Sequence, residues 1–226
     1  MVAVELQQVT KLFGRFAALR SVSAEFLSGR CYAIFGENGA GKSTLLRVVA
    51  GLARPTSGKV IFSGPAETLR QRVGYVAHAS MLYDEFSAME NLRYFGALYG
   101  IRQDEKFTAA IRSVGLDPTL ERRAGDYSQG MRQRLSLARM LMHDPEILLL
   151  DEPFSNLDVA SAREITVLIK RLRNEGKTIL VVTHQVSNVA DVADHSLLFS
   201  QGQLLLSETG VEAAKVVAPT RGDAAS

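Results

Sequence analysis

Residues 36–43 have the residue types and the spacing needed to bind a chain of phosphate groups. They read Gly-Glu-Asn-Gly-Ala-Gly-Lys-Ser and fit the pattern G-x-x-x-x-G-K-[ST]. Glycines let the backbone curl until several N–H groups face one anion, and a helix that starts at Lys42 adds the positive end of its dipole. Lys42 can reach the terminal phosphates, and the Ser43 hydroxyl can bind Mg²⁺. The predicted nucleoside triphosphate site consists of Gly36, Glu37, Asn38, Gly39, Ala40, Gly41, Lys42, Ser43 and Thr44.

Two acids, Asp151 and Glu152, follow the apolar run 147–150 and supply the second half of this chemistry. In open α/β sheets, ligands bind beyond the carboxyl ends of the strands, where these acids would lie. Asp151 can hold Mg²⁺ together with Ser43, and Glu152 can orient and deprotonate a water molecule. Acids at a strand end can also simply meet solvent, but the phosphate loop upstream favours the catalytic interpretation.

Short apolar runs bounded by glycines or charges predict the strands that position these residues. Because such runs alternate with helical patterns, we expect a parallel sheet with helices around it. The early strands instead suggest an antiparallel edge, and residues 84–144 have a helical pattern. Predicted strands are residues 2–9, 19–26, 31–35, 59–62, 73–77, 147–150, 178–182 and, as the last of the sheet, 197–199. Predicted helices include residues 43–52 and a helix through 165–172 that Gly176 ends.

The composition is that of a globular chain without a nucleic-acid role. The 226 residues are 46% hydrophobic and 22% charged, with a formal net charge of +2. That charge is too small to predict a nucleic-acid partner. The single cysteine, Cys31, cannot form an internal disulfide, so we expect a reduced, cytosolic protein. We find neither a signal peptide nor an apolar run of about 18 residues, so any membrane role is expected to act through a partner.

Residues 127–134, Tyr-Ser-Gln-Gly-Met-Arg-Gln-Arg, resemble the signature segment of the ABC transporter ATP-binding family, L-S-G-G-Q-x-Q-R. The chain keeps Ser128, Gly130, Gln133 and Arg134 of that pattern. The resemblance implies that Ser128 and Gly130 sit at a helix N-terminus and contact the γ-phosphate of ATP held by a second copy. Free N–H groups and the dipole at such a helix end suit an anion. Arg132 and Arg139 on the same helix are interpreted as a solvated basic face.

Other segments match the family in order along the chain. The resemblance implies that Phe13 stacks on adenine, with Phe16 a weaker candidate. Asp158, in the segment Ser-Asn-Leu-Asp, would contact the second copy. His184 would contact the γ-phosphate and hold Glu152 and the water in line, which makes Glu152, His184 and Lys42 the predicted catalytic set.

The resemblance covers residues 2–206 and implies a P-loop NTPase fold. The expected fold class is α/β, with a RecA-like parallel core, an antiparallel β-subdomain and an inserted α-helical subdomain. Residues 1–226 would form a single ABC ATPase domain. The core and the β-subdomain would span about 1–78 and 145–215, the helical subdomain about 79–144, and a frayed tail 217–226.

Two departures from the family pattern matter. His78 stands where the family usually has a glutamine that touches Mg²⁺ and signals to the membrane partner, while Gln129 and Met131 replace a signature glycine and glutamine. Neutral imidazole can accept a hydrogen bond or bind a metal, but it cannot copy both functions of an amide. We hypothesise that His78 makes turnover or coupling pH-sensitive. Parallel pH profiles of ATPase rate for the natural chain and His78→Gln would reject this idea.

The resemblance implies an ATP-hydrolysing transporter subunit. Its cofactors would be ATP and Mg²⁺. Its partners would be a second copy in the ATP-bound state and an integral membrane subunit, without nucleic acid. It would lie peripherally on the cytoplasmic face of the inner or cell membrane. Residues 77–78, 81–84, 90–92, 130–134 and 152–154 look like haem exporter subunits of cytochrome c maturation, and drug, polysaccharide and sodium exporter subunits share parts of this pattern.

Two further classes compete with a transporter subunit. A soluble ABC ATPase acting on DNA would need a long coiled-coil insertion, and one acting on ribosomes usually carries two such domains in one chain. The sequence has no heptad run and one phosphate loop. A non-hydrolysing scaffold would be expected to lose Lys42 or Glu152, and both are present.

Overall fold

A mixed sheet forms the centre of the molecule in this computed structural model, which describes residues 1–64 and 69–212. In spatial order, its strands are β5 (Val73–Val76), β6 (Ile147–Asp151), β7 (Thr178–Val182), β3 (Cys31–Gly36), β8 (His195–Ser200) and β9 (Gln203–Thr209). Neighbouring strands are parallel except for β8 and β9, which pair antiparallel. Every residue of β3, β6 and β7 is buried, as expected for strands covered on both faces.

A second, antiparallel sheet has the order β2-β1-β4 and covers one face of the first. Its strands are β1 (Val2–Phe13), β2 (Phe16–Leu27) and β4 (Ser57–Phe62), and α1 (Lys42–Val49) packs beside them. Tyr32 and Ile34 of β3 point into this cluster, whereas Cys31, Ala33 and Phe35 point into the other one. Side chains of a strand alternate between faces, so β3 has a separate hydrophobic layer on each side.

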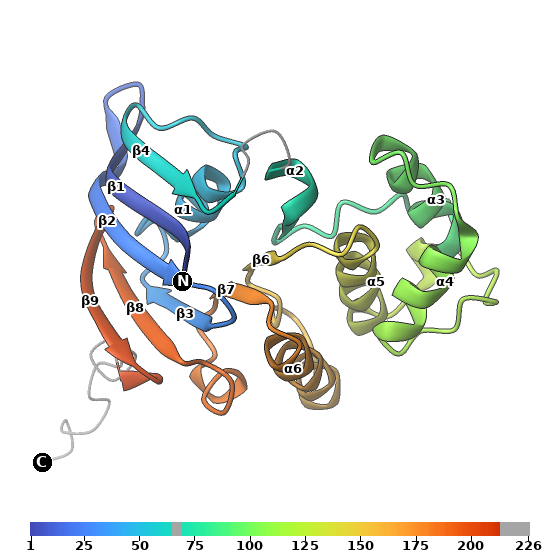
Figure 1. Ribbon diagram of the computed structural model, residues 1–226. Helices are drawn as coiled ribbons and strands as arrows, with labels where there is room; N and C mark the ends of the chain where they lie inside the picture. Colours follow the sequence, from blue (N-terminus) through green and yellow to red (C-terminus); the bar gives the residue numbers. More distant parts are fainter. Residues whose placement is uncertain (65–68, 213–226) are drawn as a thin grey trace, which may run out of the picture.

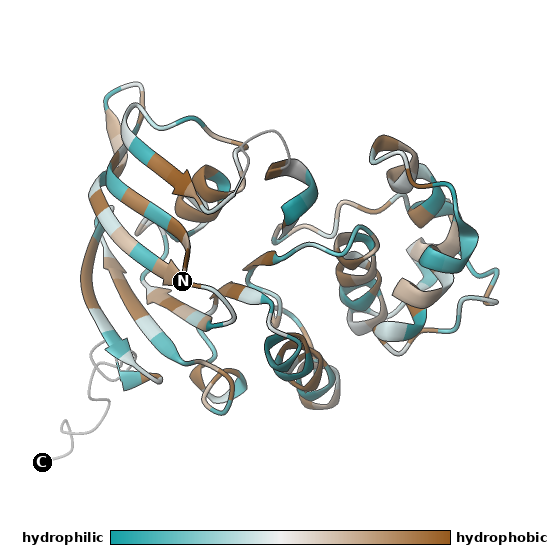
Figure 2. Cartoon of the chain, viewed as in Figure 1, coloured by the Kyte–Doolittle hydropathy of each residue, from teal (hydrophilic) through white to brown (hydrophobic). Residues whose placement is uncertain are grey.

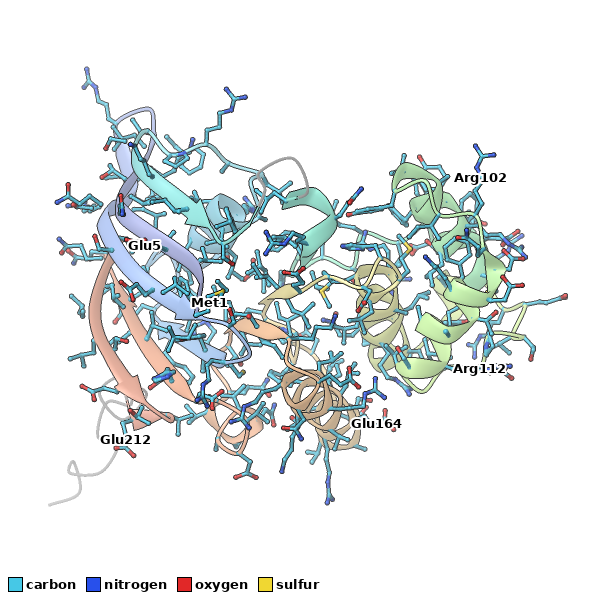
Figure 3. All side chains as sticks on the ribbon, in the orientation of Figure 1. Met1, Glu5, Arg102, Arg112, Glu164 and Glu212 are labelled. Carbon is cyan, nitrogen blue, oxygen red and sulfur yellow. The ribbon has the colours of Figure 1, made fainter. Side chains whose placement is uncertain are left out.

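Three helices gather at the end of the molecule away from the antiparallel sheet (Figure 1). They are α3 (Ala88–Leu98), α4 (Asp104–Ser113) and α5 (Gln129–Leu141), and each packs on the other two. Figure 3 shows Arg102 and Arg112 at this end and Glu5 at the strand-rich end. Shorter elements are α2 (Leu69–Arg72) and the 3₁₀ turns η2 (Ala124–Asp126) and η3 (Val186–Asn188).

Helix α6 (Val159–Asn174) covers the second face of the parallel sheet. Its buried side chains include Ile165, Leu168 and Leu172, at helical spacing, and the other side of the helix is polar, as Figure 2 shows. Gly176, with φ 87°, lies just past its end as predicted. Within the described residues, no helix combines the length and the apolar character needed to cross a bilayer.

The predicted parallel core, antiparallel sheet and inserted helices are confirmed, and the expectation that residues 197–199 are the last strand is wrong. β9 follows β8 through a tight turn at Gly202 and adds an antiparallel edge. Five of its seven residues are exposed and the other two are only partly buried, so no buried run marks it as a strand. Helices α3, α4 and α5 all lie between residues 79 and 144, while the predicted frayed tail, 217–226, lies outside the described residues.

Candidate nucleotide site

The ends of four neighbouring strands enclose a cavity of about 480 Å³. The phosphate loop follows β3, Asp151 ends β6, His184 follows β7, and His78 follows β5. These strands are parallel neighbours, so their carboxyl ends meet at one edge of the sheet. The lining residues are Phe16, Ala18, Asn38, Gly39, Ala40, Gly41, Lys42, Ser43, Thr44, His78, Asp151, Glu152, Ser155, Val182 and His184.

The phosphate loop needs glycine at both of its ends. Gly36 has φ 145°, and a Cβ there would lie 2.1 Å from the carbonyl oxygen of Phe199. Gly41 has φ 102°, and its Cβ would lie 2.3 Å from the carbonyl oxygen of Ala18. The loop is therefore pressed against β8 and β2, and only residues without a side chain allow this approach. A tight backbone loop leading into α1 is the arrangement that fits a phosphate chain.

Lys42, the first residue of α1, is hydrogen-bonded back to the start of this loop. Its side chain is buried, and its ammonium donates hydrogen bonds to the carbonyl oxygens of Gly36, at 2.7 Å, and Glu37, at 2.8 Å. Burial lowers the pKa of Lys42 from its ordinary value, although the charges of Glu152 and Asp151 act in the opposite direction. A desolvated cation held against the loop is suited to pair with phosphate oxygens.

Asp151 connects the acidic end of β6 to the phosphate loop through a hydrogen bond with Ser43. Its Oδ1 accepts a hydrogen bond from Ser43 Oγ at 2.9 Å, and its Oδ2 accepts one from the Tyr75 hydroxyl at 3.3 Å. A carboxylate next to a hydroxyl at the cavity wall is an oxygen donor set that fits Mg²⁺, so the predicted pair Ser43 and Asp151 is chemically suitable. Sequence reasoning missed Tyr75, because nothing near it in the sequence marks it as a neighbour of Asp151.

Glu152 has an unusual backbone conformation, with φ 54° in the left-handed region. Such strain in a non-glycine residue is often found at functional sites. The Glu152 N–H donates to the carbonyl oxygen of Val182 at 3.0 Å, which fixes the residue against the end of β7. The sequence motif gives no sign of this conformation.

The Glu152 carboxyl is held in a setting that suits a general base. His184 Nε2 lies 3.1 Å from Glu152 Oε1, an atom hidden from solvent. Burial raises the pKa of Glu152 above its ordinary value; His184 and Lys42 oppose this change, and Asp151 adds to it. A raised pKa makes the carboxylate a stronger base at neutral pH. The structure thus brings the three predicted catalytic side chains to one wall of the cavity.

The residues expected to act on a second copy lie elsewhere. Ser128, Gly130 and Asp158 are absent from the cavity lining in the part of the chain that the structure describes. Ser128 caps α5 by accepting from the Met131 N–H at 3.2 Å, and Asp158 caps α6 by accepting from the Ser161 N–H at 2.8 Å. These two helix starts are adjacent, because a Cβ at Gly130 would lie 2.3 Å from Ser161 Oγ.

The sequence model of a protein family, described as ABC transporter, matches residues 19–155 of this chain. These residues include the phosphate loop, the signature segment and both acids. The chain belongs to the ABC transporter family. Among relatives, the ABC transporter ATP-binding protein NatA of Bacillus subtilis is 38% identical over 198 residues, 83% of this chain and 80% of that protein. The Nod factor export ATP-binding protein I of Cupriavidus metallidurans is 33% identical, covering 94% of this chain and 76% of that protein.

A third relative is longer than this ABC chain. The probable multidrug ABC transporter ATP-binding protein YbhF of Escherichia coli is 36% identical over 91% of this chain, which spans only 37% of that protein. Among solved structures, a nucleotide-free ATP-binding cassette from an ABC transporter has a TM-score of 0.85 at 26% identity, with 96% of this chain and 95% of that chain covered. A dimeric cassette bound to ADP and Pi has a TM-score of 0.80 at 26% identity, covering 91% and 98%.

Arg132 and Arg139 do not form a solvated basic face, because their guanidinium groups bond to the carbonyl oxygens of Ala124 and Met81, each at 2.9 Å. Phe16 lines the cavity and Phe13 does not, although both rings are exposed and Lys11 lies 5.0 Å from the centre of the Phe13 ring. The stacking role of Phe13 stays a prediction.

Proposed function

We propose that this chain is the ATP-hydrolysing subunit of an ABC exporter and that two copies enclose two ATP molecules between them. One observation carries the proposal. The loop, the oxygen pair and the base line a single cavity, whereas Ser128, Gly130 and Asp158 lie outside it. Each copy therefore offers one binding cavity and one separate helix-start surface, which suits a symmetric, isologous dimer.

In the proposed reaction, each side chain at the cavity has a distinct task. Ser43 and Asp151 would hold Mg²⁺, which neutralises charge on the phosphate oxygens when it is bound. Lys42 pairs with the terminal phosphates, and Glu152 accepts a proton from the water that attacks the γ-phosphorus. His184 keeps the Glu152 carboxylate oriented. Ser128 and the N–H groups at the start of α5 contribute from the second copy.

The dimer is also supported by the solved relatives, one of which is described as a dimeric structure of a post-hydrolysis state. We further propose a separate membrane subunit, bound through the helical insertion near residues 78–91. In support, an aromatic patch made of Tyr83, Phe86, Tyr94 and Phe95 occupies this part, with Tyr83 and Tyr94 over 40% exposed. The chain would then lie peripherally on the cytoplasmic face of the membrane.

The proposed direction of transport is export. In support, the names of three relatives refer to Nod factor export, to a multidrug transporter and to lantibiotic transport. Of the alternatives to haem, which are a drug, a polysaccharide and an ion, we propose a drug as the cargo. Haem export for cytochrome c biogenesis is a second candidate, favoured by the segment Ala77-His78 and by residues 81–84. The names of the relatives reported above give it no support.

The experiment that tests hydrolysis compares the purified chain with Glu152→Gln. We expect ATP binding to survive and the rate of phosphate release to fall by about 10²- to 10⁴-fold, the usual contribution of a general base. Glu208→Gln, on exposed β9, is the matched control and should keep the natural rate. Equal rates in all three proteins would contradict the proposal.

A further inference from the structure

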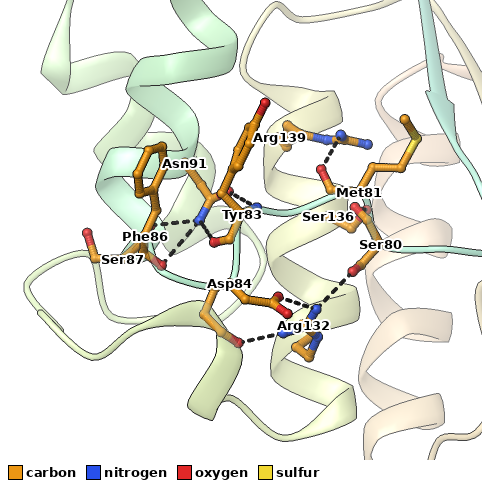
Figure 4. Close-up of polar contacts among 11 residues, drawn as sticks. Ser80, Met81, Tyr83, Asp84, Phe86, Ser87, Asn91, Arg132, Ser136 and Arg139 are labelled. Atoms are coloured by element: carbon orange, nitrogen blue, oxygen red, sulfur yellow. Dashed lines mark hydrogen bonds and ion pairs between the residues drawn. The ribbon is translucent and has the colours of Figure 1, made fainter.

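One face of α5 holds the segment that follows His78. Arg132, Ser136 and Arg139 lie at spacings of four and three residues, so they point to the same side of the helix. Figure 4 shows all three side chains reaching the backbone and side chains of residues 80–84. We call this set of three residues the α5 clamp. It connects the helix that begins at Ser128 to the segment that carries Tyr83.

The bonds of the α5 clamp follow one another along the segment. Ser136 Oγ donates to the Ser80 carbonyl oxygen at 3.1 Å, and Arg139 Nη1 donates to the Met81 carbonyl oxygen at 2.9 Å. Arg132 Nη2 lies 2.6 Å from Asp84 Oδ1. Three successive points of the segment are thus fixed to one rigid helix.

The side chains that α5 contributes to these contacts are largely buried, whereas Met81 and Asp84 on the other side are exposed. Ser136 is fully buried, and 19% of the Arg132 side chain is exposed. The Arg139 guanidinium lies 4.7 Å from the centre of the Phe95 ring, and burial lowers its pKa from the ordinary value. Removing a partner from such a bond leaves a carbonyl group without its donor.

The held segment is itself stiff. Asn91 is fully buried and donates from Nδ2 to the carbonyl oxygens of Tyr83, at 3.0 Å, Phe86, at 3.3 Å, and Ser87, at 3.0 Å. Its Oδ1 accepts from the Tyr83 N–H at 2.9 Å. A movement applied at residues 80–84 therefore reaches the whole aromatic patch rather than being absorbed within the loop.

The start of α5 is tied to the same segment from the other side. The N–H groups of Ala124 and Gly125, shortly before Ser128, donate to the carbonyl oxygens of Phe86, at 2.7 Å, and Asp84, at 2.9 Å. The aromatic patch and the N-terminus of α5 are thus joined by backbone bonds as well as by the α5 clamp. The aromatic patch and the N-terminus of α5 are therefore two surfaces of one connected unit.

We propose that Arg132, Ser136 and Arg139 are positioning residues that make the aromatic patch move together with α5 when Ser128 meets the phosphates bound by the second copy. This rests on the proposed function, because it needs ATP to draw α5 toward the partner. None of the three lines the cavity, so they transmit movement without contributing to the chemistry.

The test is hydrogen–deuterium exchange of the full chain carrying Glu152→Gln, with and without MgATP. In this parent, we expect MgATP to slow exchange by about 10-fold in residues 129–141 and also in residues 80–87. Adding Arg132→Met and Arg139→Met should keep the slowing in residues 129–141 and reduce it to about 3-fold in residues 80–87, where the two backbone bonds from Ala124 and Gly125 remain. Arg132→Lys with Arg139→Lys, which keeps both charges, should restore part of the response.

The control removes the same kind of bond outside the clamp. Arg171→Met loses a guanidinium bond to the Ser113 carbonyl oxygen of 2.8 Å and should leave both responses intact. An unchanged ATP response of residues 80–87 in the clamp variant overturns the proposal. So does a large acceleration there without nucleotide, which would make the role purely structural. If neither segment of the Glu152→Gln parent responds to MgATP, the proposed function is contradicted. The proposed transmission of movement from α5 to the aromatic patch is then contradicted as well.

Discussion

Ser43 Oγ donates a hydrogen bond of 2.9 Å to Asp151 Oδ1, although 108 residues separate them in the chain. The sheet register explains the contact. Val182 of β7 is the partner of Ile34 on one side and of Asp151 on the other, so the end of β6 lies level with Ile34, two residues before the phosphate loop begins. This alignment places a phosphate loop, a metal-type oxygen pair and a base at one wall.

The close approach at Gly41 gives a first prediction. Gly41→Ala forces a Cβ to within 2.3 Å of the Ala18 carbonyl oxygen in a left-handed conformation, so the loop must shift. We expect the free energy of unfolding to fall by about 3 kcal/mol and ATP binding to be lost. Gly39→Ala has φ 81° with nothing within 4 Å and should cost only about 1 kcal/mol. Thermal unfolding and ATP titration check both, and equal losses for the two variants would refute the steric argument.

Adenine stacking gives a second prediction. Phe13→Ala should weaken ATP binding by about 10-fold, because one aromatic–base contact contributes about 1–3 kcal/mol. Binding of tripolyphosphate, which lacks the base, should not change. Isothermal titration of Phe13→Ala and Phe16→Ala with both ligands decides between the rings. If only Phe16→Ala weakens ATP, the stacking role belongs to Phe16, which lines the cavity.

Asp194 anchors the core and gives a prediction about pH. Its Oδ2 accepts from the Cys31 N–H at 2.8 Å and from Arg173 Nε at 2.9 Å. Burial alone would raise the pKa of Asp194, but the hydrogen bonds from Arg173 and Cys31 and the charge of Arg173 outweigh it, so the pKa lies below its ordinary value. A depressed carboxyl pKa stabilises the fold above the unfolded-state pKa of about 3.9, and this stability disappears as pH falls through the folded-state value.

Asp194→Asn should therefore lower the free energy of unfolding by about 2 kcal/mol at pH 7. The gap between variant and natural chain should narrow as the pH falls below about 4. Denaturant unfolding at several pH values measures both. A gap that stays constant down to acid pH would show that the charge of Asp194 is not the source of the stability.

Cys31 should be chemically inert in the folded chain. Burial, reinforced by Asp194 and opposed by Arg173, raises its pKa to about 12. Since the thiolate is the reactive form, labelling by a thiol reagent at pH 8 should be about 10³-fold slower than in denaturant. Complete labelling of the native chain within minutes would contradict the burial of this thiol.

The sequence predicted the parts of the candidate site that depend on contiguous residues. The phosphate loop from Gly36 to Ser43 needs a tightly curled backbone, and the closely spaced glycines of the sequence indicate that conformation. The strained φ of Glu152 and the contact of Tyr75 with Asp151 depend on strand register, which the sequence does not state. Arg139 was misjudged for the same reason, since its partner carbonyl at Met81 lies 58 residues away.

The boundaries of the elements followed the strength of the apolar signal. β7 occurs at its predicted residues, because a fully buried strand is apolar throughout. β9 went unnoticed because it alternates half-buried leucines with exposed residues at a sheet edge. The limits of the helical subdomain, about 79–144, stay a prediction.

The proposed function depends on ATP being held between two copies of this chain. The most direct measurement is the molar mass in solution of Glu152→Gln at saturating MgATP. We expect a dimer with MgATP and a monomer without it, and Ser128→Arg should abolish the dimer while the cavity still binds nucleotide. A chain that stays monomeric with MgATP, even in the presence of its membrane subunit, would show that ATP is not held between two copies.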